Sequence, residues 1–128
     1  MSVRRILNVG QCSYDHHQIE RFLHSSFGAE VSRAATAVQA LDLLRAETFD
    51  LVLVNRVFDA DRASGLAFLE DLRSDATLAK TPVMLISDYP DAQKQAEKLG
   101  ALPGFGKSEL WSPACIERLE KALGPRTT

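Results

Sequence analysis

The feature that most constrains this chain is the segment 49–58, which reads FDLVLVNRVF. Its residues 51–54 are all apolar, and the polar Asn55 follows them. Short apolar runs with β-branched residues are typical of strands buried on both faces of a parallel sheet. In open parallel α/β sheets, functional groups lie at the carboxyl ends of the strands. Asn55 therefore occupies a position where a nucleophile or a ligand is expected, and its side chain is a neutral amide.

The rest of the chain alternates between strand-like and helix-like patterns. Further strands are expected at 5–9, 29–34, 82–87 and 102–106, and a helical pattern follows each strand; Ser112 is placed to cap the last helix, with Pro113 at its first position. This alternation predicts an α/β fold with a parallel sheet covered by helices on both faces. Right-handed crossovers favour a flavodoxin-like (βα)5 three-layer sandwich, a five-stranded sheet of order 2-1-3-4-5.

Composition and charge narrow the class of protein. The 128 residues, 45% of them hydrophobic, are enough for one core, and we expect a single domain over 1–124 with a loose tail or linker stub at 125–128. A net charge of −2 argues against binding nucleic acid. No apolar run approaches the roughly 20 residues of a membrane span, and no signal-peptide pattern is present. We therefore expect a cytoplasmic protein whose cysteines, Cys12 and Cys115, are free thiols.

Four stretches, in their order and spacing, resemble the receiver domain of bacterial two-component response regulators. They are ILNVG at 6–10, FDLVLVNRVF at 49–58, TPVMLIS at 81–87 and GALPGFGKS at 100–108. The resemblance covers about residues 4–123. It implies a signalling domain that is not an enzyme in its own right.

The resemblance also implies a set of functional positions. Receiver domains carry a phosphoacceptor aspartate at the end of the third strand and an acidic pair, which helps to hold Mg²⁺, after the first strand. In this chain the acceptor position is Asn55, and the acidic pair falls on Gly10 and Gln11. The hydroxyl that ends the fourth strand and the lysine that ends the fifth are retained as Ser87 and Lys107.

These replacements change the chemistry that the positions can support. Mg²⁺ prefers anionic oxygen ligands, whereas Gly10 has no side chain and Gln11 and Asn55 offer only neutral amide oxygens. A carboxylate can attack phosphorus to form an acyl phosphate, but an amide nitrogen is a very poor nucleophile. We expect a degenerate receiver domain with no metal, no cofactor and no catalytic residue, which acts by phosphorylation-independent contact with a protein partner.

Other departures fall on the surface that receiver domains use for partners, formed by the fourth helix, the fifth strand and the fifth helix. The aromatic switch position holds Gly104, and Phe105 comes one place later. Tyr89, Phe105 and Trp111 lie along this surface. Large apolar residues such as Phe105 and Trp111 usually belong to the core, whereas an exposed aromatic cluster would indicate a binding hot spot. A homodimer through the same surface is a further hypothesis.

Two other functions stay open. Asp59, in the loop after the third strand, could replace Asn55 as a non-standard phosphoacceptor. Ser87 and Lys107, with the loop 101–108, could instead hold a small anion or a nucleotide. A structural alternative for the lysine is a bond to the Asn55 amide, or an ion pair with a nearby carboxylate, for which the candidates are Asp15, Asp59 and Asp61.

The sequence predicts that the single change Asn55→Asp does not create a phosphoacceptor. The new carboxylate would still lack the acidic pair that holds Mg²⁺. We expect no gain in mass when this variant is incubated with acetyl phosphate and Mg²⁺ and examined by mass spectrometry. A phosphoryl group on the unchanged protein would contradict the interpretation of Asn55, and its loss in Asp59→Asn would identify the acceptor.

Overall fold

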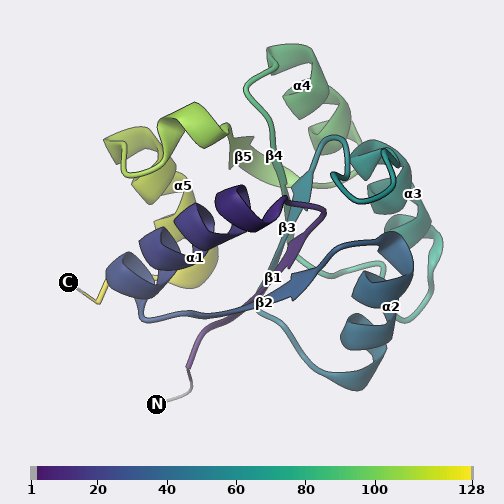
Figure 1. The fold of residues 1–128 in the computed structure, drawn as a ribbon, viewed down its shortest axis with the longest axis horizontal. Helices are drawn as coiled ribbons and strands as arrows, with labels where there is room; N and C mark the ends of the chain where they lie inside the picture. The colour runs from purple at the N-terminus through teal and green to yellow at the C-terminus, as the bar shows by residue number, and fades with distance from the viewer. Residues whose placement is uncertain (1–2, 128) are drawn as a thin grey trace.

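The strands form one parallel sheet with helices on both of its faces (Figure 1). The structure is a computed structural model that describes residues 3–127. In chain order the elements are β1 (Arg5–Val9), α1 (Ser13–Phe27), β2 (Glu30–Ala34), α2 (Ala37–Ala46), β3 (Leu51–Asn55), α3 (Gly65–Ser74), β4 (Val83–Ile86), α4 (Pro90–Lys98), β5 (Leu102–Phe105), a short 3-10 helix η1 (Lys107–Glu109) and α5 (Pro113–Leu123).

The sheet has the order β2-β1-β3-β4-β5, which confirms the predicted flavodoxin-like topology. All four strand pairs are parallel, and the β4–β5 pair is irregular between Met84 and Ile86. The predicted strand 49–58 was too long, because the strand ends at Asn55. Beyond it, Val57 forms an isolated antiparallel bridge with Ser64, and the chain turns away from the sheet.

Alternate residues of the central strands supply two separate cores. Leu7 and Val54 point to the face covered by α2, α3 and α4, whereas Ile6 and Leu53 point to the face covered by α1 and α5. Successive side chains of a strand project to opposite faces, so a strand buried on both sides must be apolar throughout. This requirement explains the continuous apolar run that identified the third strand from the sequence.

Hydrogen bonds cap α5 and attach the last described residues to the domain. The Ser112 hydroxyl accepts a hydrogen bond from the backbone N–H of Cys115, which confirms the predicted cap of α5. After α5, Arg4 donates to the carbonyl of Pro125 at 2.7 Å, and the backbone N–H of Thr127 donates to the carbonyl of Ser26. Residues 125–127 are exposed and lie outside the helices and strands, and these two contacts attach them to the domain; Thr128 lies outside the described residues.

Within residues 3–127, none of the helices combines the length and the apolar character needed to cross a bilayer.

Arg73 joins α3 to the amino-terminal edge of β4 and β5. Its guanidinium donates to the carbonyls of Ala79, Leu99 and Thr81 at 2.8–2.9 Å, and to that of Gly100 at 3.1 Å. Partial burial lowers the pKa of Arg73 from its usual value, yet the group stays charged at any physiological pH. Arg73 thus donates to four backbone carbonyls that accept no other hydrogen bond within residues 3–127.

Arg73→Ala is expected to lower the free energy of unfolding by about 3 kcal/mol, because it leaves several part-buried carbonyls without a donor. The matched control is Arg45→Ala, which removes an exposed ion pair with Asp75. That change is expected to cost about 0.5 kcal/mol. Urea denaturation of the two variants measures the difference, and equal losses would contradict the assigned role of Arg73.

Candidate functional site

A cleft of about 350 Å³ opens at the carboxyl edge of the sheet, above the ends of β3 and β4. It contains three of the residues that the sequence singled out, Asn55, Ser87 and Lys107. The remaining lining residues come from the start of α1, from the end of β4 and from the loops after β3 and β4: Cys12, Asp15, Arg56, Val57, Asp59, Arg62, Ile86, Asp88 and Tyr89. This location is the one expected for a functional site in a parallel sheet.

Asn55 uses its amide as a donor. Its Nδ2 donates to the backbone carbonyl of Gly10 at 3.0 Å, and the backbone N–H of Asp59 donates to the same oxygen at 2.9 Å. The side chain therefore ties the end of β3 to the turn after β1. An ionised carboxylate at this position could not make that bond, because it has no proton to donate.

An aromatic ring fills the space into which a side chain at position 10 would project. Gly10 has a φ of +83°, and a Cβ built on it would lie 2.2 Å from Cδ1 of Phe58. Phe58 is completely buried and packs edge-on against Phe68, with 6.0 Å between the ring centroids. Any side chain at position 10, including the carboxylate found in receiver domains, would require this ring to move.

Gln11 is not among the residues that line the cleft. It is almost fully buried, and neither atom of its side-chain amide has a hydrogen-bond partner within the described residues. The neighbouring Asn8 is also buried and places its Nδ2 3.1 Å from Nδ1 of His16. Burial lowers the pKa of His16, which favours the neutral imidazole in this contact. Gln11 therefore offers no side-chain atom to a ligand in the cleft.

Lys107 and Ser87 both have partners inside the protein. Nζ of Lys107 lies 2.8 Å from Oδ2 of Asp15, so Asp15 is the partner among the alternatives that the sequence left open. The Ser87 hydroxyl accepts a hydrogen bond from the backbone N–H of Tyr89 at 3.1 Å. The positive charge of the lysine is thus offset within the cleft.

The cysteines differ in their surroundings, and both are free thiols, as expected. Cys12 caps α1, where its sulfur accepts a hydrogen bond from the backbone N–H of Asp15. Cys115 is buried in α5, and desolvation raises the pKa of its thiol to about 12. The described residues contain no group of three or more histidine, cysteine or carboxylate side chains that could hold a metal ion.

The three aromatic residues predicted for the partner surface do not form one cluster. Phe105 is 1% exposed and belongs to the core with α1 and α5, as expected for a large apolar residue, so it is not part of an exposed partner surface. Trp111 is 54% exposed, and its ring lies 4.9 Å from that of Phe22 on α1. Tyr89 is 60% exposed and is covered on one side by the guanidinium of Arg56, 4.7 Å from the ring centroid.

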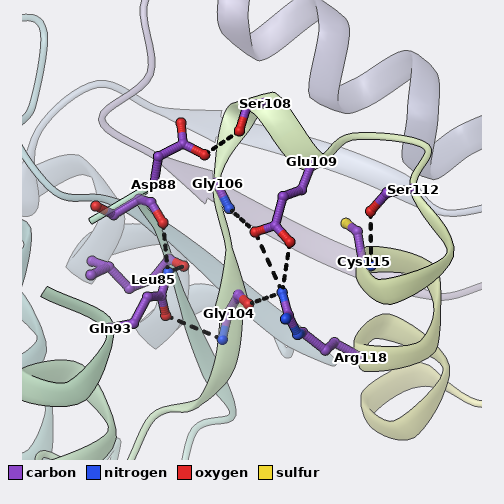
Figure 2. Close-up of polar contacts among 11 residues, drawn as sticks. Leu85, Asp88, Gln93, Gly104, Gly106, Ser108, Glu109, Ser112, Cys115 and Arg118 are labelled. Carbon is purple, nitrogen blue, oxygen red and sulfur yellow. Dashed lines mark hydrogen bonds and ion pairs between the residues drawn. The ribbon is translucent and has the colours of Figure 1, made fainter. Parts of the chain in front are cut away.

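Gln93 of α4 is a structural residue that the sequence analysis missed. Its Nε2 donates to the carbonyls of Leu85 and Ser87, and its Oε1 accepts from the backbone N–H of Gly104 (Figure 2). The amide therefore bridges β4 and β5 where their pairing is irregular. A Cβ at Gly104 would lie 2.1 Å from the Leu85 carbonyl oxygen, so this bridge requires glycine where receiver domains have their switch aromatic.

The outer edge of β5 is covered by two further side chains. Glu109 accepts from the backbone N–H of Gly106, and Arg118 of α5 donates to the carbonyl of Gly104 at 2.9 Å (Figure 2). Arg118 and Glu109 also form an ion pair. An edge strand with unpaired backbone groups invites pairing with another chain, and these bonds occupy the groups on Gly104 and Gly106.

Solved structures with the same architecture are those of bacterial signalling proteins. The signal receiver domain of a DNA-binding response regulator from Colwellia psychrerythraea has a TM-score of 0.76 and 21% identity, over 92% of this chain and 96% of that one. The chemotaxis response regulator CheY4 of Vibrio cholerae has a TM-score of 0.69 and 21% identity, over 95% and 97%. The chain has the receiver-domain fold. NtrX from Brucella abortus, with a TM-score of 0.79 and 23% identity over 95% of this chain, is matched over only 28% of its own length.

Searches by sequence give a different result: no protein-family model and no curated protein matches the chain. The relationship therefore rests on the receiver-domain fold. This fold places Asn55 at the end of β3, Ser87 directly after β4, and Lys107 shortly after β5. The three positions named from the sequence resemblance thus lie together at one edge of the sheet.

We expect Gln93→Ala to lower the free energy of unfolding by about 2 kcal/mol, because two buried carbonyls and one N–H lose their partner. The exchange of the Gly104 amide proton should become faster. Gln95→Ala is the matched control, since Gln95 is exposed on the same helix and its side chain makes no hydrogen bond among the described residues. Urea denaturation and hydrogen exchange by NMR test both variants; an unchanged Gly104 exchange rate would disprove the bridge.

Proposed function

We propose that this chain is a degenerate receiver domain, which acts by protein–protein contact and takes no phosphoryl group. The observation that carries the proposal is the bond from Asn55 to the Gly10 carbonyl. The acceptor position is a hydrogen-bond donor that holds the site together, and so it is not available as a nucleophile. In this proposal the domain needs no cofactor, is not an enzyme and resides in the cytoplasm.

Two further contacts support the loss of metal-dependent phosphotransfer. The Phe58 ring occupies the space that a carboxylate at position 10 would need, and the Gln11 side chain is buried and does not line the cleft. Mg²⁺ would meet neutral amides where it requires anionic oxygens. Lys107, which would stabilise a phosphoryl group, is instead paired with Asp15.

The Gln93 bridge supports a domain with one dominant conformation. Receiver domains switch through their fourth helix, fifth strand and an aromatic residue, whereas here a side-chain amide joins α4 to β4 and β5. A movement of α4 away from the sheet would break three hydrogen bonds at once. We therefore propose that the partner recognises a preformed surface.

A groove between β5 and α5 is the proposed partner surface. It has a volume of about 340 Å³ and is lined by apolar side chains with charged residues at its rim: Met84, Leu102, Pro103, Ala114, Glu117, Arg118, Lys121 and Ala122. Leu102 is 38% exposed at its mouth. Apolar centres with a polar rim are typical of protein interfaces. We propose that a second copy of the chain can associate through this groove.

Sedimentation velocity over a range of concentrations tests this proposal. We expect self-association that acetyl phosphate and Mg²⁺ leave unchanged, while the mass of the protein also stays constant. Leu102→Glu should weaken the association about tenfold, because a charge would be buried in the apolar groove. The control Val38→Glu alters an exposed apolar residue on α2 and should have no effect.

Association that requires acetyl phosphate would contradict the phosphorylation-independent function. A chain that stays monomeric at every concentration would exclude the homodimer and leave a different protein as the partner.

A further inference from the structure

A second hollow adjoins the cleft on its α4 side. This hollow has a volume of about 520 Å³ and lies between the start of α3 and the start of α4. Arg56, Val57, Arg62 and Tyr89 line both spaces and form the wall between them. Since small-molecule sites commonly enclose about 300–1,000 Å³, either space is large enough for a ligand.

The shared wall carries two arginines without a carboxylate partner. Arg56 contacts the Tyr89 ring, and among residues 3–127 neither Arg56 nor Arg62 forms an ion pair or a side-chain hydrogen bond. Asp59 lines the cleft and Asp91 lines the hollow, but neither carboxylate is within ion-pair distance of these guanidiniums. The cations that are available in this region are therefore Arg56 and Arg62, because Lys107 is paired with Asp15.

The loop that carries Arg62 is held in one shape. The Val57–Ser64 bridge closes its base, and Phe58 exchanges backbone hydrogen bonds with Ala63 and Arg62. Arg62 has a φ of +62°, a conformation that is uncommon for a non-glycine residue and that Trp111 also adopts, with a φ of +71°. Strained residues of this kind concentrate at functional sites, and here the strain is at one of the two unpaired arginines.

We propose that Arg56, Arg62 and Tyr89 form a binding site for a small organic oxyanion, a phosphate ester or a carboxylate, which binds without a metal ion. The guanidinium fork matches both oxyanions in geometry and charge. The exposed part of the Tyr89 ring provides a flat surface for an aromatic or apolar body attached to the anion. The two arginines supply the positive charge that Mg²⁺ supplies in a metal-dependent phosphate site.

The geometry gives each group a distinct role. Arg56 is positioned by the Tyr89 ring, so its charge and the aromatic surface lie together. Arg62 faces the same wall from a loop anchored by the buried Phe58. Lys107 has no part in this site. The inference goes beyond the proposed function and does not depend on it.

The test is a titration of the ¹⁵N-labelled protein with phenyl phosphate in the presence of EDTA, followed by amide NMR. We expect saturable shifts at residues 55–64 and 87–90. Arg56→Gln and Arg62→Gln should each weaken binding about tenfold, since each removes a charge-assisted hydrogen bond. Parallel titrations with benzoate and inorganic phosphate separate the contributions: benzoate binding shows that a carboxylate suffices, and weaker binding of inorganic phosphate shows that Tyr89 contacts the aromatic body.

A control variant keeps the result specific. Arg21→Gln removes an exposed arginine from α1 and should leave the affinity unchanged. A thermal melt of each variant verifies that it is folded. The proposal is wrong if no ligand produces saturable shifts, if Arg21→Gln weakens binding equally, or if binding requires Mg²⁺.

Discussion

The chemistry available at this site depends on the packing of Phe58 against Gly10. The ring is fully buried, and it lies where any side chain at position 10 would have to project. It anchors the loop after β3, which the Val57–Ser64 bridge then closes. One apolar contact therefore removes the space for a metal-binding carboxylate and also presents Arg62 at the wall of the cleft.

A second set of contacts holds the edge strand β5 against its neighbours. Gln93 bridges β4 and β5, and Arg118 and Glu109 occupy the backbone groups of Gly104 and Gly106. These bonds come from three different elements and converge on one short edge strand (Figure 2). A strand of four residues that contains Pro103 and Gly104 has little pairing strength of its own, so its position depends on side chains from its neighbours.

Much of the fold was predictable because buried parallel strands impose their own sequence pattern. The continuous apolar run of β3 and the alternation of strands with helices led to the correct strand order. The candidate site was predictable in part: Asn55, Ser87 and Lys107 do converge on the cleft. The choice of Asp15 among the candidate partners of Lys107 and the bridging role of Gln93 were not predictable, because each depends on a contact between segments distant in the chain.

The sequence by itself determined the strand order and the residue types at the edge of the sheet, because periodicity and chain connectivity are local properties. It also determined that the acceptor position carries an amide. Only the tertiary structure decided that this amide donates to Gly10, that Asp15 neutralises Lys107 and that two arginines remain unpaired. Which charges stay unpaired depends on the distances between side chains from different elements, and those distances exist only after the chain has packed.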